Sequence, residues 1–157
     1  MLAEVNGHAP EVPAGRERVN RLQEIAASLP QVELQTAHLF AGEMYARVVT
    51  RPAGTLIVGK VHREPHFYVV ARGRVAVNSG DGTDAVIHEA GTVIVSQPGT
   101  KRAVWALEDS VCLTVHHVGN ARDLEMIEAV LIEQDSAPCL YDASNRVLPG
   151  VRKEIAQ

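Results

Sequence analysis

The sequence has little of several features that would assign a protein to a class at once. Aromatic residues make up only 4% of the 157 residues, so a core has to be built from the aliphatic side chains that dominate the 46% hydrophobic fraction. Two cysteines, Cys112 and Cys139, are too few for a disulfide framework, and we expect both to be reduced thiols. No segment approaches 18 consecutive apolar residues, and the N-terminus lacks a signal-peptide pattern. These absences predict a cytoplasmic protein without a membrane span.

Basic residues are also scarce and scattered. The chain has 15 Lys and Arg against 19 Asp and Glu, which gives a net charge of −4. Nucleic-acid-binding proteins usually cluster basic side chains on one surface. The sequence therefore predicts that nucleic acid is not a partner.

What the chain does contain is a series of short runs rich in β-branched residues. Turn-forming groups separate these runs, among them the Pro-Ala-Gly at 52–54, the Gly-Asp-Gly at 80–82 and the Pro-Gly at 98–99. The spacing leaves no room for helices between strands, which favours a sandwich or closed barrel over alternating β and α units. We expect eight strands, over 43–50, 54–61, 66–73, 74–79, 85–90, 92–97, 101–107 and 110–118. The predicted fold class is all-β.

Helical periodicity occurs only outside this region. Residues 16–29 place Val19, Leu22, Ile25, Ala26 and Leu29 on one face, and Pro30 ends that helix. A second helix is expected within 121–134, followed by a polar, extended tail. We therefore divide the chain into an N-terminal arm and helix (1–30), a barrel (31–119) and a C-terminal helix and tail (120–157).

Two blocks of residues carry the chemical signal. In the first, we expect His62 to end one strand and His66 to open the next, so that two imidazoles on paired strands face the same side and share a metal. The second is Gly91-Thr-Val-Ile-Val-Ser-Gln-Pro-Gly99-Thr-Lys-Arg102, a strand, a turn and another strand.

Together these blocks resemble the paired motifs of the cupin superfamily over roughly residues 34–119, and the resemblance implies a cupin or jelly-roll barrel. Counting back from Gly73 places His66 at the family's glutamate position and His62 at its second histidine. Lys60 and Arg102 stand where the resemblance implies two further histidines. The usual ligand set is thus partly replaced.

A third ligand is expected from the last strand of the barrel. Side chains alternate along a strand, so either His116 or His117 faces inward, not both. We favour His116, which would place Cys112 and Thr114 on the lining face. The opposite face, which carries Val111, Leu113, Val115 and His117, is more apolar and stays open as the inward one.

Two functions from different classes follow. The blocks Thr114-Val-His116, His62-x-x-x-His66 and Gly99-Thr-Lys-Arg102 resemble small phage- and prophage-encoded cupin-like proteins, which implies a non-enzymatic virion or assembly component. The alternative is a metal-dependent isomerase or dioxygenase acting on a small carboxylate-bearing molecule. Whether the chain is an enzyme is left undecided, and no catalytic residue is assigned.

On the enzyme hypothesis His62, His66 and His116 bind Fe, Mn, Zn or Ni, while Arg102 and Lys60 hold an anion and Tyr68 donates a proton. A pocket without metal is equally compatible with the sequence. Imidazole nitrogens converging within about 4 Å would favour the enzyme, and a pocket filled by Val, Leu and a core Trp105 would favour the structural role.

The predicted partners are further copies of the chain in a homo-oligomer, and other virion proteins on the phage hypothesis. The two helices and the C-terminal tail are the contact regions we expect, because arms that reach over a neighbour are a common route to oligomers.

Overall fold

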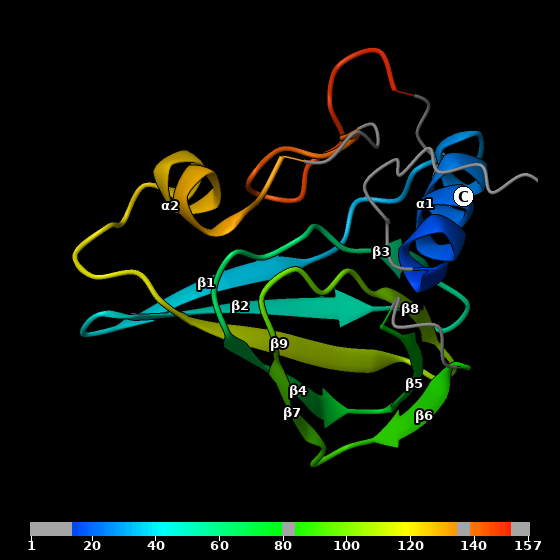
Figure 1. Cartoon of the computed structure of the whole chain (residues 1–157), viewed down its shortest axis with the longest axis horizontal. Coiled ribbons are helices and arrows are strands. Elements are labelled where there is room, and N and C mark those ends of the chain that lie inside the picture. The colour runs from blue at the N-terminus through cyan, green and yellow to red at the C-terminus, as the bar shows by residue number, and fades with distance from the viewer. Residues whose placement is uncertain (1–13, 80–83, 135–138, 152–157) are drawn as a thin grey trace, which may run out of the picture.

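The structure is a computed structural model that describes residues 14–79, 84–134 and 139–151. It consists of two antiparallel sheets with one helix before and one helix after them (Figure 1). The elements are α1 (Ala14–Ala27), β1 (Thr36–Ala41), β2 (Met44–Arg51), β3 (Leu56–Val58), β4 (His66–Arg72), β5 (Arg74–Asn78), β6 (Val86–Glu89), β7 (Val93–Ser96), β8 (Ala103–Ala106), β9 (Ser110–His117) and α2 (Leu124–Leu131).

The order of the strands defines a jelly roll. One sheet has the order β1-β2-β9-β4-β7 and the other β3-β8-β5-β6. Strands β2 to β9 pair in a nested series, first with last: β2 with β9, β3 with β8, β4 with β7 and β5 with β6. A long hairpin wound in this way into two facing sheets is the jelly-roll architecture that cupins share with lectin and capsid domains. The predicted all-β fold with a flanking helix on each side is confirmed.

The first strand, β1, was not among the expected strands. It pairs with β2 through a tight turn at Gly42 and extends the five-stranded sheet at its edge. Its polar residues Thr36 and His38 alternate with apolar ones, but the run is short and begins within a polar connection. The pattern alone therefore did not separate it from a loop.

The inward face of the five-stranded sheet is the more polar one. On β9, Ser110, Cys112 and His116 are buried, whereas His117 is exposed and contacts the Glu43 carboxylate at 3.1 Å. His116 thus faces the barrel interior and His117 does not.

The core between the two sheets is built mainly from aliphatic side chains. Its buried members come from both sheets and are Tyr68, Val70, Val75, Val77, Val104 and Cys112. Gly73 connects β4 and β5 with a φ of 77°, and a Cβ there would overlap the Asp109 carbonyl. Only glycine fits this position.

Trp105 does not belong to this core, contrary to the prediction. Its neighbours Val104 and Ala106 on β8 are buried, while Trp105 is 46% exposed. Because Val104 points into the core cluster, alternation along the strand turns the indole outward.

Both helices lie on the same side of the strands (Figure 1). In α1 only Val19 of the predicted apolar face is fully buried, and Ile25 and Leu29 remain exposed. Helix α2 begins at its N-cap Asp123, whose carboxylate accepts a hydrogen bond from the Met126 amide, and it buries Ile127 and Leu131.

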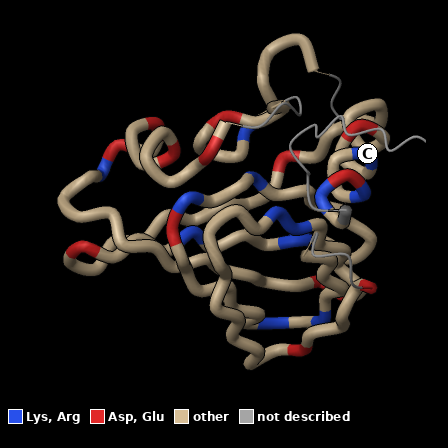
Figure 2. The backbone as a smooth tube through the Cα atoms, in the orientation of Figure 1, with Lys and Arg blue, Asp and Glu red and all other residues tan. Residues whose placement is uncertain are grey.

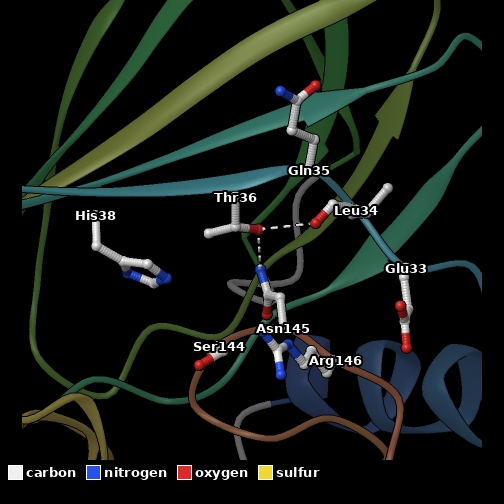
Figure 3. A pocket seen from close by; sticks show the side chains of 8 residues that line it. All are labelled: Glu33, Leu34, Gln35, Thr36, His38, Ser144, Asn145 and Arg146. Carbon is white, nitrogen blue, oxygen red and sulfur yellow. Dashed lines mark hydrogen bonds between the residues drawn. The ribbon is translucent and has the colours of Figure 1, made fainter.

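The C-terminal segment folds back onto β1 and β2. An isolated bridge joins Tyr141 and Val147, and Asn145 occupies the left-handed region with φ 63°. Figure 3 shows Asn145 pointing toward Thr36, and its amide donates to the Thr36 hydroxyl at 3.1 Å. A hollow of about 400 Å³ lies between this loop and the start of β1.

Some predictions fall outside the described residues: the arm before residue 14, the turn at 80–82, and residues 135–138 and 152–157 of the tail. The three-part division of the chain stays a prediction. Within the described ranges no helix has the length and apolarity needed to cross a membrane.

Candidate functional site

Three histidines converge at one end of the barrel. His66 opens β4, His116 lies near the end of β9, and His62 lies in the connection between β3 and β4. Their ring centroids are 4.3 Å (His62–His66), 5.0 Å (His62–His116) and 4.6 Å (His66–His116) apart. One ring nitrogen of each lies within 4.8 Å of the others. The predicted triad is therefore assembled, at a spacing somewhat wider than 4 Å.

The sequence had suggested that His62 ends a strand, but in the structure it does not. β3 ends at Val58, and His62 instead forms a bridge with Ile132, just after α2. The carbonyl of His62 also accepts a hydrogen bond from the Gly99 amide at 2.9 Å. Two long-range contacts, rather than a strand, thus hold His62 in position.

The hydrogen bonding of the triad leaves ring nitrogens available to a ligand. His66 Nδ1 lies 3.3 Å from the Glu64 carbonyl oxygen, to which it can donate a hydrogen bond. In that tautomer the electron pair on Nε2 is free to coordinate a metal. His116 Nδ1 is buried and has no hydrogen-bond partner among the described residues. A buried ring nitrogen without a partner is costly unless a ligand completes it.

Burial keeps the triad neutral. Desolvation lowers the pKa of His62 to about 3, helped by the neighbouring His66 and His116 and by the charges of Arg47 and Arg102. Desolvation likewise lowers the pKa of His116 to about 3, and it lowers the pKa of His66. Neutral imidazole is the form that coordinates metals.

The donor set fits a first-row transition metal. With metal–nitrogen bonds of about 2.0–2.1 Å, nitrogens that share an ion lie about 3 Å apart, so the widest separation in the triad would have to shorten by about 2 Å, which small ring rotations can provide. Three nitrogen ligands on one side of an ion leave positions open for water or substrate. The three nitrogen ligands do not select one ion, because coordination geometry and metal availability decide which ion occupies such a site.

Two members of the triad, His62 and His116, line a cavity of about 1150 Å³. Val, Leu and Trp105 contribute to its wall, but they do not fill it. Arg102 lines it, with its guanidinium carbon 5.5 Å from the centre of the Tyr68 ring. Lys60 lines it too, but its ammonium group is paired with the Glu128 carboxylate.

Sequence reasoning missed two cavity arginines on β2. Arg51 Nη1 donates to the Tyr68 hydroxyl at 3.0 Å, and Arg47 Nη2 donates to the Asn145 side-chain oxygen. Alternation along β2 places both on the same face as the buried Tyr45 and Val49. That alternation was the signal that could have identified them.

Outside the cavity, lysines and arginines are distributed over helices, strands and loops (Figure 2). Exposed pairs such as Arg74 with Glu108 are of the kind that contribute little to stability. The concentration of arginine inside the barrel therefore stands out against an ordinary surface.

No protein-family model matches the chain, and no curated protein matches it by sequence. Several solved structures have a similar fold. One is a protein from Klebsiella pneumoniae with a double-stranded beta-helix domain, at 20% identity and a TM-score of 0.49, over 65% of this chain and 86% of that one. Another is an RmlC-like cupin from Shewanella frigidimarina, at 20% identity and a TM-score of 0.47, over 56% and 78%.

KdgF from Halomonas sp. is also similar, at 19% identity and a TM-score of 0.46, over 53% of this chain and 78% of that one. All three resemble the chain at low sequence identity. The strand order of the chain itself is what defines its fold.

Proposed function

We propose that the chain is a metal-dependent protein of the cupin type that acts on a small carboxylate-bearing molecule. The observation that carries the proposal is the convergence of His62, His66 and His116 within 4.8 Å at the edge of a large cavity. A bound ion would serve as a Lewis acid toward a substrate oxygen, chemistry compatible with isomerases and with dioxygenases.

The other residues of the cavity have roles that do not depend on the ion. Arg102 offers a planar guanidinium to a substrate carboxylate. Burial raises the pKa of Tyr68, so its hydroxyl keeps its proton at neutral pH and remains available as a donor. Lys60 is less suited to hold an anion than the sequence suggested, because Glu128 already neutralises it.

The virion or assembly role implied by the resemblance to phage-encoded proteins stays a prediction. No contact among the described residues bears on it, so it is not part of the proposal.

Metal content tests the proposal directly. Protein stripped with a chelator and then dialysed separately against Zn²⁺, Mn²⁺, Fe²⁺ and Ni²⁺ should take up one ion per chain. His62→Ala and His116→Ala should each lower the affinity at least about 100-fold, since even changes to groups that only support a ligand cost 10- to 100-fold. Elemental analysis measures the stoichiometry.

His117→Ala is the matched control, because it removes the neighbouring but exposed imidazole. It should bind metal as the unaltered chain does. Equal metal uptake by the His62→Ala, His116→Ala and His117→Ala variants, or no uptake by any of them, would contradict the proposal.

A further inference from the structure

Three arginines place positive charge in the cavity. Arg47, Arg51 and Arg102 all line it, and Arg51 is only 7% exposed. The Nε atom of each is buried without a hydrogen-bond partner among the described residues. Arginine stays charged in proteins, so three guanidinium charges with unused donors face one space.

The hydrogen-bond and ring partners of these arginines are neutral. The Asp142 carboxylate, which does not line the cavity, acts electrostatically on Arg47 from outside it. Arg51 donates to the Tyr68 hydroxyl at 3.0 Å, and Arg47 donates to the Asn145 amide oxygen. Arg102 lies against the face of the Tyr68 ring. The acidic side chains among the lining residues are Glu128, which is paired with Lys60, and the exposed Glu133.

Buried guanidinium charge that no ion pair among the described residues neutralises costs several kcal/mol, so its presence points to a ligand that supplies the anion. Arg47 lies opposite Thr114, two residues from His116 on the inward face, while Arg51 lies four residues further along β2. The positive charge is thus spread along the cavity rather than concentrated at one point. Apolar side chains such as Val49 and Val104 complete the wall, which suits a carbon skeleton.

We propose that the cavity binds a small organic dicarboxylate, whose two carboxylates pair with the guanidinium groups of Arg47, Arg51 and Arg102. The proposal deepens the proposed function by naming the ligand class of the same site. It requires the arginines but not the metal. Two separated carboxylates match a spread set of planar guanidinium groups better than a single phosphate does.

Calorimetric titration at low salt tests this with dicarboxylates from malonate to adipate. Each is compared with the monocarboxylate of the same chain length, for example succinate with butyrate. At least one dicarboxylate should bind about tenfold or more tightly than its monocarboxylate partner. Arg51→Met should weaken that dicarboxylate about tenfold or more and bring the two affinities together.

Arg18→Met is the matched control, because Arg18 is an exposed arginine on α1 outside the cavity. It should leave both affinities unchanged. Equal binding of the two series, no binding of either, or an Arg51→Met variant that discriminates like the unaltered chain would overturn the proposal. Tighter binding of glycerol 2-phosphate than of every dicarboxylate would overturn it in favour of a phosphate ester.

Running the titrations on both metal-free and Zn²⁺-loaded protein separates this proposal from the previous one. Selective dicarboxylate binding by a protein that takes up no metal would support the dicarboxylate proposal and contradict the metal proposal. One bound ion per chain without dicarboxylate selectivity would support the metal proposal and contradict the dicarboxylate proposal.

A second, independent observation concerns the outward side of the five-stranded sheet, which we call the outer face. Strand registers align two rows of side chains across all five strands. The rows are Leu39-Ala46-Val115-Phe67-Val95 and Ala37-Val48-Leu113-Val69-Val93. Every member is apolar, whereas the solvated face of an antiparallel sheet normally carries polar residues.

The outer face is accessible in the single chain. Leu39, Phe67, Val93 and Val95 are between 50% and 58% exposed, and Met44 on the same face of β2 is 54% exposed. Two adjacent rows of five apolar side chains, four of them at least half exposed, therefore form one contiguous apolar patch across this sheet. Contiguous apolar patches of this size mark association sites.

We infer that the outer face binds the outer face of a second copy of this chain. The two rows carry no charge and no hydrogen-bonding side chain with which to select a different partner, and a two-fold axis lets the patch meet itself. Two twisted sheets pack face to face about 10 Å apart, so the dimer would gain a second sandwich core. The contact regions predicted from the sequence, the helices and the tail, are not needed for it.

Sedimentation analysis tests this inference. The unaltered chain should sediment as a dimer of twice its 17.0 kDa mass. Phe67→Lys combined with Val95→Lys should give a folded monomer, because both positions are about half exposed and the substitutions leave the interior intact. Ile87→Lys, at a 59% exposed position on β6 in the other sheet, should remain dimeric. A monomeric unaltered chain, or a dimer that survives the double substitution, would overturn the inference.

Discussion

At the residue scale, the triad contains a buried imidazole with an unsatisfied ring nitrogen. His116 is 5% exposed, and its Nδ1 has no partner among the described residues. Desolvation makes protonation unfavourable and leaves the electron pairs free. The cost of holding such groups inside the barrel is a dependence of stability on pH.

This dependence has a definite sign. The pKa of His62 and that of His116 are lowered from 6.5 to about 3, so between these values the unfolded chain binds more protons than the folded one. The contribution of neutral histidine to the free energy of unfolding is complete above pH 6.5 and is lost as the pH falls toward 3. Each group adds up to about 1.4 kcal/mol of loss per pH unit in this window.

Urea unfolding of the metal-free protein between pH 7 and pH 4 measures the effect. His116→Gln removes one of the two groups and should give a shallower loss of stability with falling pH. His117→Gln, at the exposed neighbouring position, should keep the slope of the unaltered chain. Identical slopes for His116→Gln and the unaltered chain would show that His116 is not held neutral by the fold.

At the element scale, α2 acts as the support of His62. Ile127 and Leu131 pack with Tyr45 in a small core of their own, and Ile132 then forms the bridge to His62. Arg63 adds a hydrogen bond from its Nε to the Ile132 carbonyl at 3.0 Å. The position of a triad member therefore depends on a helix that lies outside the barrel in the sequence.

Ile127→Ala tests this coupling. Removing the buried side chain should lower the free energy of unfolding by about 2–5 kcal/mol, and it should weaken Zn²⁺ binding because the bridge to His62 loosens. Val130→Ala, at a 65% exposed position of the same helix, should change stability by no more than about 0.5 kcal/mol. Urea unfolding measures the change in stability and Zn²⁺ titration the change in affinity. Equal Zn²⁺ affinities for the two variants would show that α2 does not support His62.

Strand alternation explains which parts of the structure were predictable. Turn residues and β-branched runs located β2 to β9 in the sequence, and the spacing between His62 and His66 brought two ligands together. Whether His116 or His117 faced inward could not be derived, because the rule that apolar side chains point inward fails on β9. There the polar face lines the cavity and the apolar residues Leu113 and Val115 lie on the outer face.

The missed arginines have the same origin. Arg47 and Arg51 are charged residues in a strand, and charge ordinarily indicates the solvent side. Their inward position follows only from the phase set by Tyr45 and Val49. His62 was misplaced for another reason, since its contacts with Gly99 and Ile132 are long-range and leave no local pattern.

At the scale of the whole molecule, the nested pairing governs how the parts come together. The first strand of the jelly roll, β2, pairs with the last, β9, and β4 lies beside β9 in the same sheet. Contacts between strands so distant in the sequence form slowly compared with local hairpins. The barrel closes only when its final strand is added.

That final strand also carries the third histidine. During synthesis, a chain that ends before residue 116 has His62 and His66 but no closed barrel to hold them together. An ion present at that stage would find only the imidazoles of His62 and His66, on a segment that the last strand does not yet hold in place. The strand order of the jelly roll thus makes the complete three-histidine site, and any metal binding that depends on it, available only after the last strand has paired.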